Sequence, residues 1–211
     1  MEHDQQRVNW RSHTPMKHIF SATIAVLLIA AADSTGQEAA SGARETNRVN
    51  RVPDAVFIPT PQDVVDAMLE LAGVRSSDVV YDLGCGDGRI VITAAKRYGC
   101  RSTGFDIDEL RVEQSRENVL KAGLSDLVTI ENRNVLKTDL RTATVITLYL
   151  TPKLNARLIP QFERMGPGSR IVAHESDIPG LRPDKVVEVD SKEDGRRHVI
   201  YLWKTPWKRN D

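Results

Sequence analysis

Two spacings of apolar residues alternate along the chain from residue 52 onward. Short continuous apolar runs are typical of strands buried in a parallel sheet, and apolar residues that recur every three or four positions are typical of helices. Glycine follows several of the helical stretches, as is common where a helix ends. Helices are predicted over 62–72, 89–98, 109–122 and 154–165, and strands over 79–83, 102–105, 128–131, 144–150, 170–173, 186–189 and 199–203.

This order of elements predicts how the sheet is built. Strands that alternate with helices predict a mostly parallel sheet with crossover helices. The last two strands flank Glu193-Asp194-Gly195 and are expected to close the sheet as an antiparallel pair. The predicted fold class is therefore α/β, a Rossmann-like doubly wound sheet with an antiparallel closing strand pair.

The N-terminal part contains an uncharged apolar run, residues 19–32, which follows Lys17 and ends in three alanines. As a helix this run would span roughly 21 Å at about 1.5 Å per residue, less than the roughly 30 Å of a bilayer core. These features predict a signal peptide and export to the periplasm or the outside. A membrane anchor through residues 19–32, with membrane association, is the alternative, and both Met1 and Met16 are candidate starts.

The segment that follows, residues 33–51, is small, polar and poor in large apolar groups. Such a segment cannot bury enough surface to offset the entropy of ordering it, so a flexible linker is predicted. The expected organisation is a signal peptide or membrane anchor at 1–32, this linker, a folded domain at 52–205 and a short tail at 206–211.

Composition narrows the classes of function. The 211 residues carry 29 Lys+Arg and 29 Asp+Glu, so the formal net charge is zero, and the broad positive field that collects nucleic acid is not expected. Two cysteines are too few for a disulfide scaffold. Neither the cysteines nor the five histidines show metal-ligand spacing, so no metal site is predicted.

The most informative stretch is a glycine cluster directly after the predicted strand 79–83. Gly84, Gly86 and Gly88 let the backbone turn tightly and approach a ligand, and the helix that follows directs free N–H groups toward it. A dinucleotide-binding loop would place its third glycine at position 89, which is Arg89, so an NAD-dependent oxidoreductase is disfavoured. A phosphate-binding P-loop would need a G-K-[ST] ending, which this loop lacks.

The remaining pattern, D-x-G-x-G-x-G, resembles motif I of the class I S-adenosylmethionine-dependent methyltransferases, and the resemblance extends over residues 53–203. Asp106 ends the second strand, where a carboxylate can accept from both ribose hydroxyls. The resemblance implies that Asp106 holds the ribose of S-adenosylmethionine and that Ile107 lies against the adenine. Asp108 suits the N-cap of the next helix better than Asp106 does.

The same resemblance implies contacts at the two ends of the cofactor. Where the family has an acidic residue after the third strand, this chain has Asn134, followed by Val135. An amide can still accept from the adenine amino group and donate to a ring nitrogen. Asp82 would reach the methionine end, directly or through water, or would only stabilise its turn. Cys85 is interpreted as a small packing residue.

The acceptor side should lie beyond the fourth and fifth strands, since ligands bind at the carboxyl edge of such sheets. That edge offers Tyr149, Thr151 and Pro152, and then His174 and Glu175. Tyr149 is the candidate for contact with the acceptor, with core packing as its alternative, and His174 and Glu175 suit strand-end hydrogen bonds. The N-P-P-Y pattern of adenine-amine methyltransferases is missing here, which disfavours nucleobase N-methylation.

A narrower resemblance rests on Phe57-Ile58-Pro59-Thr60-Pro61, the glycine cluster and the closing hairpin. These look like the small protein-lysine methyltransferases, which include enzymes acting on the adenine nucleotide translocase and the ATP synthase c subunit. The resemblance implies a cofactor-binding role for Thr60 and a protein lysine as acceptor. A small-molecule N- or O-methyltransferase is the alternative, and so is an exported, non-catalytic S-adenosylmethionine-binding module, because this cofactor is made in the cytoplasm.

Overall fold

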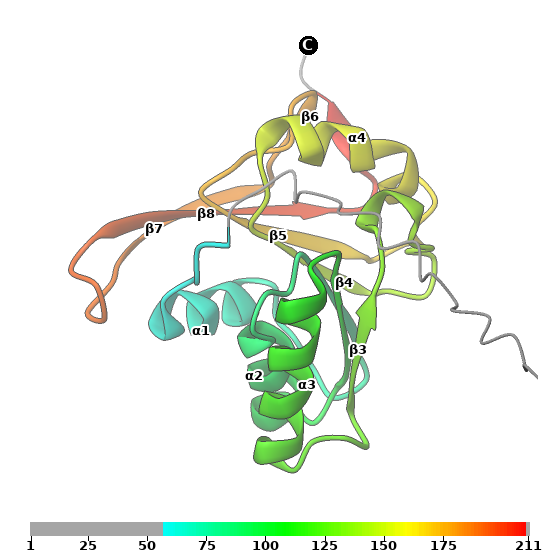
Figure 1. Cartoon of the computed structure of the whole chain (residues 1–211). Helices are drawn as coiled ribbons and strands as arrows, with labels where there is room; N and C mark the ends of the chain where they lie inside the picture. Colours follow the sequence, from blue (N-terminus) through cyan, green and yellow to red (C-terminus); the bar gives the residue numbers. More distant parts are fainter. Residues whose placement is uncertain (1–56, 210–211) are drawn as a thin grey trace, which may run out of the picture. The chain divides into compact units, whose positions relative to one another are not determined.

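The computed structural model describes residues 57–209 and confirms the α/β fold class. Its main sheet has seven strands in the order β3-β2-β1-β4-β5-β8-β7. Strands β1 to β5 are parallel, β8 runs antiparallel to β5, and β7 runs antiparallel to β8 (Figure 1). These strands are β1 Val79–Leu83, β2 Arg101–Asp106, β3 Val128–Asn132, β4 Val145–Leu148, β5 Arg170–His174, β7 Lys185–Asp190 and β8 Arg197–Lys204.

Helices cover both sides of this sheet. The helices α1 (Gln62–Leu71), α2 (Arg89–Tyr98) and α3 (Glu109–Ala122) lie on one side, and α4 (Pro152–Phe162) lies on the other (Figure 1). Local signals set their limits. The side chain of Asp108 accepts a hydrogen bond from the backbone of Leu110 and so caps α3, as predicted, while α2 and α3 both end at a glycine in the left-handed conformation.

The two faces of the sheet bury separate apolar cores. One packs α4 against the sheet around Phe162, Ile146 and Trp203, all fully buried. On the opposite face α1 and α2 pack around Met68 and Val145, and α2 and α3 form a further cluster beside them. Every residue of β4 is buried, which confirms the prediction that its continuous apolar run would be covered on both faces.

The limits of the fourth strand and fourth helix differ from the sequence expectation. The strand ends at Leu148, two residues before the end of the apolar run, because the chain turns there toward Thr151. The hydroxyl of Thr151 accepts a hydrogen bond from the backbone of Leu154 (3.3 Å), and Pro152 occupies the first turn, so α4 begins earlier than its apolar pattern suggests.

A second, two-stranded sheet is not foreseen by the sequence. It pairs β6 (Leu181–Arg182) with β9 (Lys208–Arg209), and each strand is too short to show a period. Trp207 donates from Nε1 to the backbone carbonyl of Phe162 at 2.9 Å. The paired structure therefore extends to Arg209, beyond the expected boundary at residue 205.

Several predictions concern parts of the chain outside the described residues. These are the signal peptide or anchor at 1–32, the linker at 33–51 and the choice between Met1 and Met16. Within residues 57–209, no helix combines the length and apolar character needed to cross a membrane.

Candidate active site

A cavity of about 380 Å³ lies at the carboxyl ends of β1, β2 and β4, the edge at which ligands of such sheets are expected. It is bordered by the glycine loop, residues 84–88, and by the covering segment, residues 57–61, which precedes α1. Of the residues predicted for a cofactor or acceptor site, eight line this cavity: Thr60, Asp82, Gly84, Asp106, Ile107, Asn134, Val135 and Tyr149.

The three glycines of the loop all require the absence of a side chain. Gly84, Gly86 and Gly88 have φ values of 86°, 54° and 80°, which residues with a Cβ rarely adopt. A Cβ at Gly86 would come within 2.1 Å of the Phe57 ring, and one at Gly88 within 2.2 Å of Ser115 Oγ. Gly84 lines the cavity, whereas Gly86 and Gly88 set the course of the loop behind it.

Asp106 joins the glycine loop to the end of β2. Its carboxylate accepts hydrogen bonds from the backbone amides of Gly86 (2.9 Å) and Asp108 (3.0 Å), one on each oxygen. Each carboxylate oxygen has a further lone pair. Asp106 can therefore hold the loop and still accept from two ligand hydroxyls in the cavity.

Asp82 is a buried carboxyl at the floor of the cavity, on β1. Burial raises the pKa of Asp82 to about 7, the hydrogen bond from Thr147 Oγ1 (2.6 Å) opposes this, and the charges of Asp106 and Asp87 raise it further. A carboxyl with this pKa is only partly ionised at neutral pH. A ligand ammonium placed beside it would favour the ionised form.

The adenine end predicted from the sequence is formed by Ile107, Asn134 and Val135, which all line the cavity. Asn134 also has a local role, because its Oδ1 accepts from the backbone of Leu136 (2.9 Å) and caps the short 3₁₀ helix η1 (Val135–Lys137). The side-chain amide retains its Nδ2 donor and the second lone pair of Oδ1 for contact with a ligand.

The covering segment is fastened to the site at Thr60. The Thr60 hydroxyl lies 3.1 Å from His174 Nδ1, and its carbonyl accepts from the guanidinium of Arg89 at 2.7 Å. Arg89 also forms an ion pair with Asp87 of the glycine loop at 2.7 Å. Thr60 thus lines the cavity as predicted, but its polar atoms hold the segment in place.

Phe57, Arg89 and Arg111 line the cavity and were not recognised as site residues from the sequence. The guanidinium of Arg111 lies over the Phe57 ring, 4.1 Å from its centroid. The sequence identifies Arg89 only as the residue at the position where a dinucleotide-binding loop has its third glycine. The contacts of these three side chains join parts of the chain that no local motif connects.

The acceptor end predicted from the sequence is represented by Tyr149, with Leu150 and Leu154 beside it in the cavity wall. Tyr149 is only partly buried, and its ring centroid lies 4.1 Å from that of His174. Burial raises the pKa of Tyr149, and the charge of Glu175 adds to this, so the phenol is neutral. Thr151 and Pro152 serve the start of α4 and are not among the lining residues.

A buried polar cluster lies behind Tyr149. His174 Nε2 is 2.9 Å from His198 Nδ1, which in turn is 3.1 Å from a carboxylate oxygen of Glu175. Burial, followed by the neighbouring His198, lowers the pKa of His174 to about 4, so that imidazole is neutral. The expected strand-end hydrogen bonding of His174 is confirmed. The sequence does not predict the part that His198 plays in this cluster, because His198 lies on β8, far along the chain from His174.

Cys85 is buried in the glycine loop, and burial raises the pKa of its thiol well above the ordinary value. A Cβ on the adjacent Gly104 of β2 would come within 2.8 Å of Cys85 Sγ, so the side chain fills the space that this glycine leaves. Both facts agree with the packing role expected for Cys85.

Comparison with protein families gives a match over residues 82–185 to the model described as "ANTKMT methyltransferase domain". A protein of Saccharolobus islandicus named protein-lysine N-methyltransferase is 41% identical over 155 residues, which are 72% of this chain and 94% of that protein. The adenine nucleotide translocase lysine N-methyltransferase of Mus musculus is 31% identical over 125 residues, which are 58% of this chain and 54% of that protein.

Among solved structures, an RNA methyltransferase from Salinibacter ruber in complex with S-adenosyl-L-homocysteine superposes with a TM-score of 0.65 at 43% identity. The match covers 70% of this chain and 93% of that one. The bound compound in that structure is the demethylated form of the cofactor that motif I implies for this chain.

Proposed function

This chain belongs to the S-adenosylmethionine-dependent methyltransferases of the ANTKMT methyltransferase domain family, and we propose that the acceptor of its methyl group is the side-chain amine of a protein lysine. The observation that carries the proposal is the 41% identity with a protein-lysine N-methyltransferase along 94% of that protein. The cavity beside the glycine loop supports it, since it provides one wall for the cofactor and another for the acceptor.

The residues of the cavity fit S-adenosylmethionine. Its volume of about 380 Å³ is within the usual range of small-molecule sites. Asp106 would hold the ribose, Ile107 and Val135 the faces of the adenine, Asn134 its edge, and Asp82 the methionine ammonium. When bound, the cofactor supplies a methyl group that is already electrophilic on its sulfonium. The protein therefore has to align the acceptor, exclude water and keep the acceptor nitrogen unprotonated.

A lysine acceptor must lose its proton before it can react. From a reference pKa of about 10.4 this costs roughly 4–5 kcal/mol at pH 7. The acceptor wall of the cavity, Tyr149, Leu150 and Leu154, offers aromatic and aliphatic surface, which disfavours an ammonium and so lowers this cost.

The rim of the cavity favours an acceptor presented by a larger molecule. Ile58 of the covering segment lines the cavity and is 57% exposed, so it places a large apolar side chain at the rim. Pro59 beside it is exposed as well. Together they form an apolar edge on which the surface around a lysine can rest while its side chain enters.

The acceptor is tested by supplying purified full-length protein and S-adenosylmethionine with a labelled methyl group to a cell extract divided into protein, RNA and small molecules. We expect label in protein, and mass spectrometry should place it on lysine. The variant Asp106→Ala, which is expected to lose the cofactor, is the matched inactive control. Label confined to RNA, the acceptor class in the name of the Salinibacter ruber protein, or to a metabolite would overturn the lysine assignment.

For localisation we propose export directed by the apolar run 19–32, with retention as a membrane anchor as the alternative. The short length of this apolar run and the basic residue Lys17 before it support the proposal. N-terminal sequencing of the mature protein, combined with cell fractionation, tests it. A mature chain that begins at Met1 or Met16 and stays in the cytoplasmic fraction would contradict both forms.

A further inference from the structure

Three side chains at the junction of β5 and β8 direct potential metal ligands toward one point. His174 ends β5, Glu175 follows it, and His198 lies on β8, the strand hydrogen-bonded to β5. The distance from His174 Nε2 to His198 Nδ1 is 2.9 Å. The Glu175 carboxylate oxygen is 3.1 Å from His198 Nδ1 and 3.6 Å from His174 Nε2.

These separations suit a common metal ion. Zinc binds histidine nitrogen at about 2.0–2.1 Å and carboxylate oxygen at a similar length, so two ligands at a tetrahedral angle lie about 3.3 Å apart. The three observed separations fall on either side of that value. A shift of a few tenths of an ångström would let one ion replace the direct contacts.

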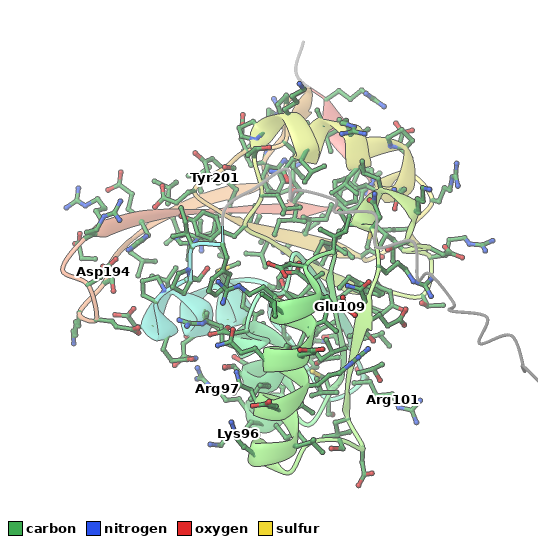
Figure 2. The ribbon with its side chains drawn as sticks, in the orientation of Figure 1. Lys96, Arg97, Arg101, Glu109, Asp194 and Tyr201 are labelled. Atoms are coloured by element: carbon green, nitrogen blue, oxygen red, sulfur yellow. The ribbon has the colours of Figure 1, made fainter. Side chains whose placement is uncertain are left out.

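The outer nitrogens of both histidines are hydrogen-bonded, as in known metal sites. His198 Nε2 lies 3.1 Å from the carboxylate of Asp194, and His174 Nδ1 lies 3.1 Å from the Thr60 hydroxyl. Metal-bound histidines usually donate from their second nitrogen to an oxygen in this way. Asp194, labelled in Figure 2, comes from the turn between β7 and β8 and so reaches His198 from outside the pair.

These contacts leave one nitrogen of each ring facing inward. His198 Nδ1 and His174 Nε2 lie against each other, with the Glu175 carboxylate oxygen beside them. A metal ion would need both of these nitrogens free of protons, with the ring protons on His198 Nε2 and His174 Nδ1, where Asp194 and the Thr60 hydroxyl can accept them.

Glu175 adds independent support. Its φ of 61° makes it the only residue other than glycine with positive φ in the described part of the chain. Backbone conformations of this kind gather at functional sites. Both histidines are buried, whereas Glu175 is exposed, so an ion held by the three would keep one side open to solvent.

We propose that His174, Glu175 and His198 bind a divalent transition metal ion of the zinc class, with solvent water as the remaining ligand. Two imidazole nitrogens and one carboxylate oxygen suit zinc and its first-row neighbours rather than magnesium or calcium. None of the three ligands lines the cavity, so the ion has a structural role. It ties β5 to β8 and, through the contact of His174 with Thr60, holds the covering segment.

The experiment uses the untagged full-length protein, freed of metal with a chelator. Calorimetric titration with zinc should show one saturable site per chain, and cobalt(II) should give the visible absorption bands of a low-symmetry nitrogen–oxygen site. His198→Asn should abolish both signals. Asp194→Asn, which removes the charge from the acceptor of His198 Nε2, should weaken binding by about 10- to 100-fold.

Glu175→Gly separates loss of the ligand from loss of the fold. Glycine adopts the left-handed conformation of residue 175 without strain, so this variant should keep its metal-free melting temperature while losing zinc affinity. A triple variant of the other histidines, His3→Gln, His13→Gln and His18→Gln, is the control and should bind zinc normally.

Two results would overturn the proposal. One is the absence of saturable zinc binding in the wild type, which would favour the opposite tautomer of His174, with its Nε2 proton donated to His198. The other is zinc binding that survives in both His198→Asn and Glu175→Gly but disappears in the triple histidine variant. Neither result bears on the identity of the methyl acceptor.

Discussion

The two walls of the cavity are built by different means. The wall on β1 and β2 is made largely of backbone: a loop that turns where no Cβ can fit, held by one carboxylate that accepts from two main-chain amides. The wall beyond β4 is made of side chains, with the Tyr149 ring packed against the buried His174, which in turn contacts His198.

This difference separates two requirements of a methyltransferase. A wall made of backbone keeps its shape when neighbouring side chains change, which suits a cofactor that never varies. A wall made of side chains can be altered by substitution without moving the cofactor, which suits an acceptor that differs among relatives. The two walls should therefore respond differently to substitution.

The largest effect is expected from Asp106→Ala. It removes two charge-assisted contacts to the ribose, each contributing about 1.5–3 kcal/mol, so affinity for S-adenosylhomocysteine should fall about 100-fold or more. Calorimetry measures this affinity, and Glu117→Ala on the exposed surface of α3 is the matched control. Equal affinity in wild type and Asp106→Ala would remove Asp106 from the cofactor site.

Gly88→Ala should cost about 2 kcal/mol of folding free energy, because the new side chain must adopt positive φ and meets Ser115 Oγ. Gly86→Ala should cost less, since the Phe57 ring that it meets stands at the end of a rotatable side chain. Urea denaturation measures both. If Gly88→Ala unfolds at the wild-type urea concentration, the loop does not depend on that glycine.

Asp82 should make cofactor affinity depend on pH. Its pKa of about 7 in the folded protein means that the carboxylate is lost on acidification, so affinity should fall by up to about tenfold per pH unit below 7. In Asp82→Asn the affinity should be lower at pH 8 and nearly independent of pH. Titrations of both proteins at pH 6, 7 and 8 measure the difference, and parallel curves would contradict the contact.

The raised pKa of Asp82 also makes the free energy of unfolding depend on pH. Because it lies above the ordinary value of 3.8, the folded state holds this proton more tightly than the unfolded chain does. The resulting stability is complete below about pH 4 and is lost as the pH rises to about 7. Relative to wild type, Asp82→Asn should therefore gain stability between about pH 5 and pH 8, as thermal denaturation without cofactor will measure.

The smallest effect is expected on the wall made of side chains. Tyr149→Ala should raise the KM for the methyl acceptor several-fold and leave affinity for S-adenosylhomocysteine unchanged, because it removes acceptor surface only. Tyr149→Phe keeps the ring and should remain near the wild type. A large loss of cofactor affinity in Tyr149→Ala would show that the two walls are coupled.

The sequence predicts the backbone wall better than the side-chain wall, for a physical reason. A tight turn is indicated by three glycines within five positions, Gly84, Gly86 and Gly88. Asp106 can be identified because it directly follows a short apolar run that predicts a strand. These signals are local, so spacing reveals them. The α/β class follows in the same way from two alternating periods.

The features that the sequence does not predict depend on contacts between distant parts of the chain. His198 lies beside His174 because β8 pairs with β5 in one particular register. The spacing of residues along the chain does not predict the register of two strands joined by a long connection. Arg89 meets Thr60 because the covering segment folds back over the glycine loop. The β6–β9 pair is missed because two-residue strands show no period.

The two amide hydrogens between Asp106 and the backbone of Gly86 and Asp108 have a practical consequence. When ribose hydroxyls donate hydrogen bonds to the same carboxylate, the NMR resonances of both amides should shift. The exchange of these two amide protons with solvent should slow. Recording these two signals would reveal cofactor occupancy directly, without a labelled ligand or a known methyl acceptor.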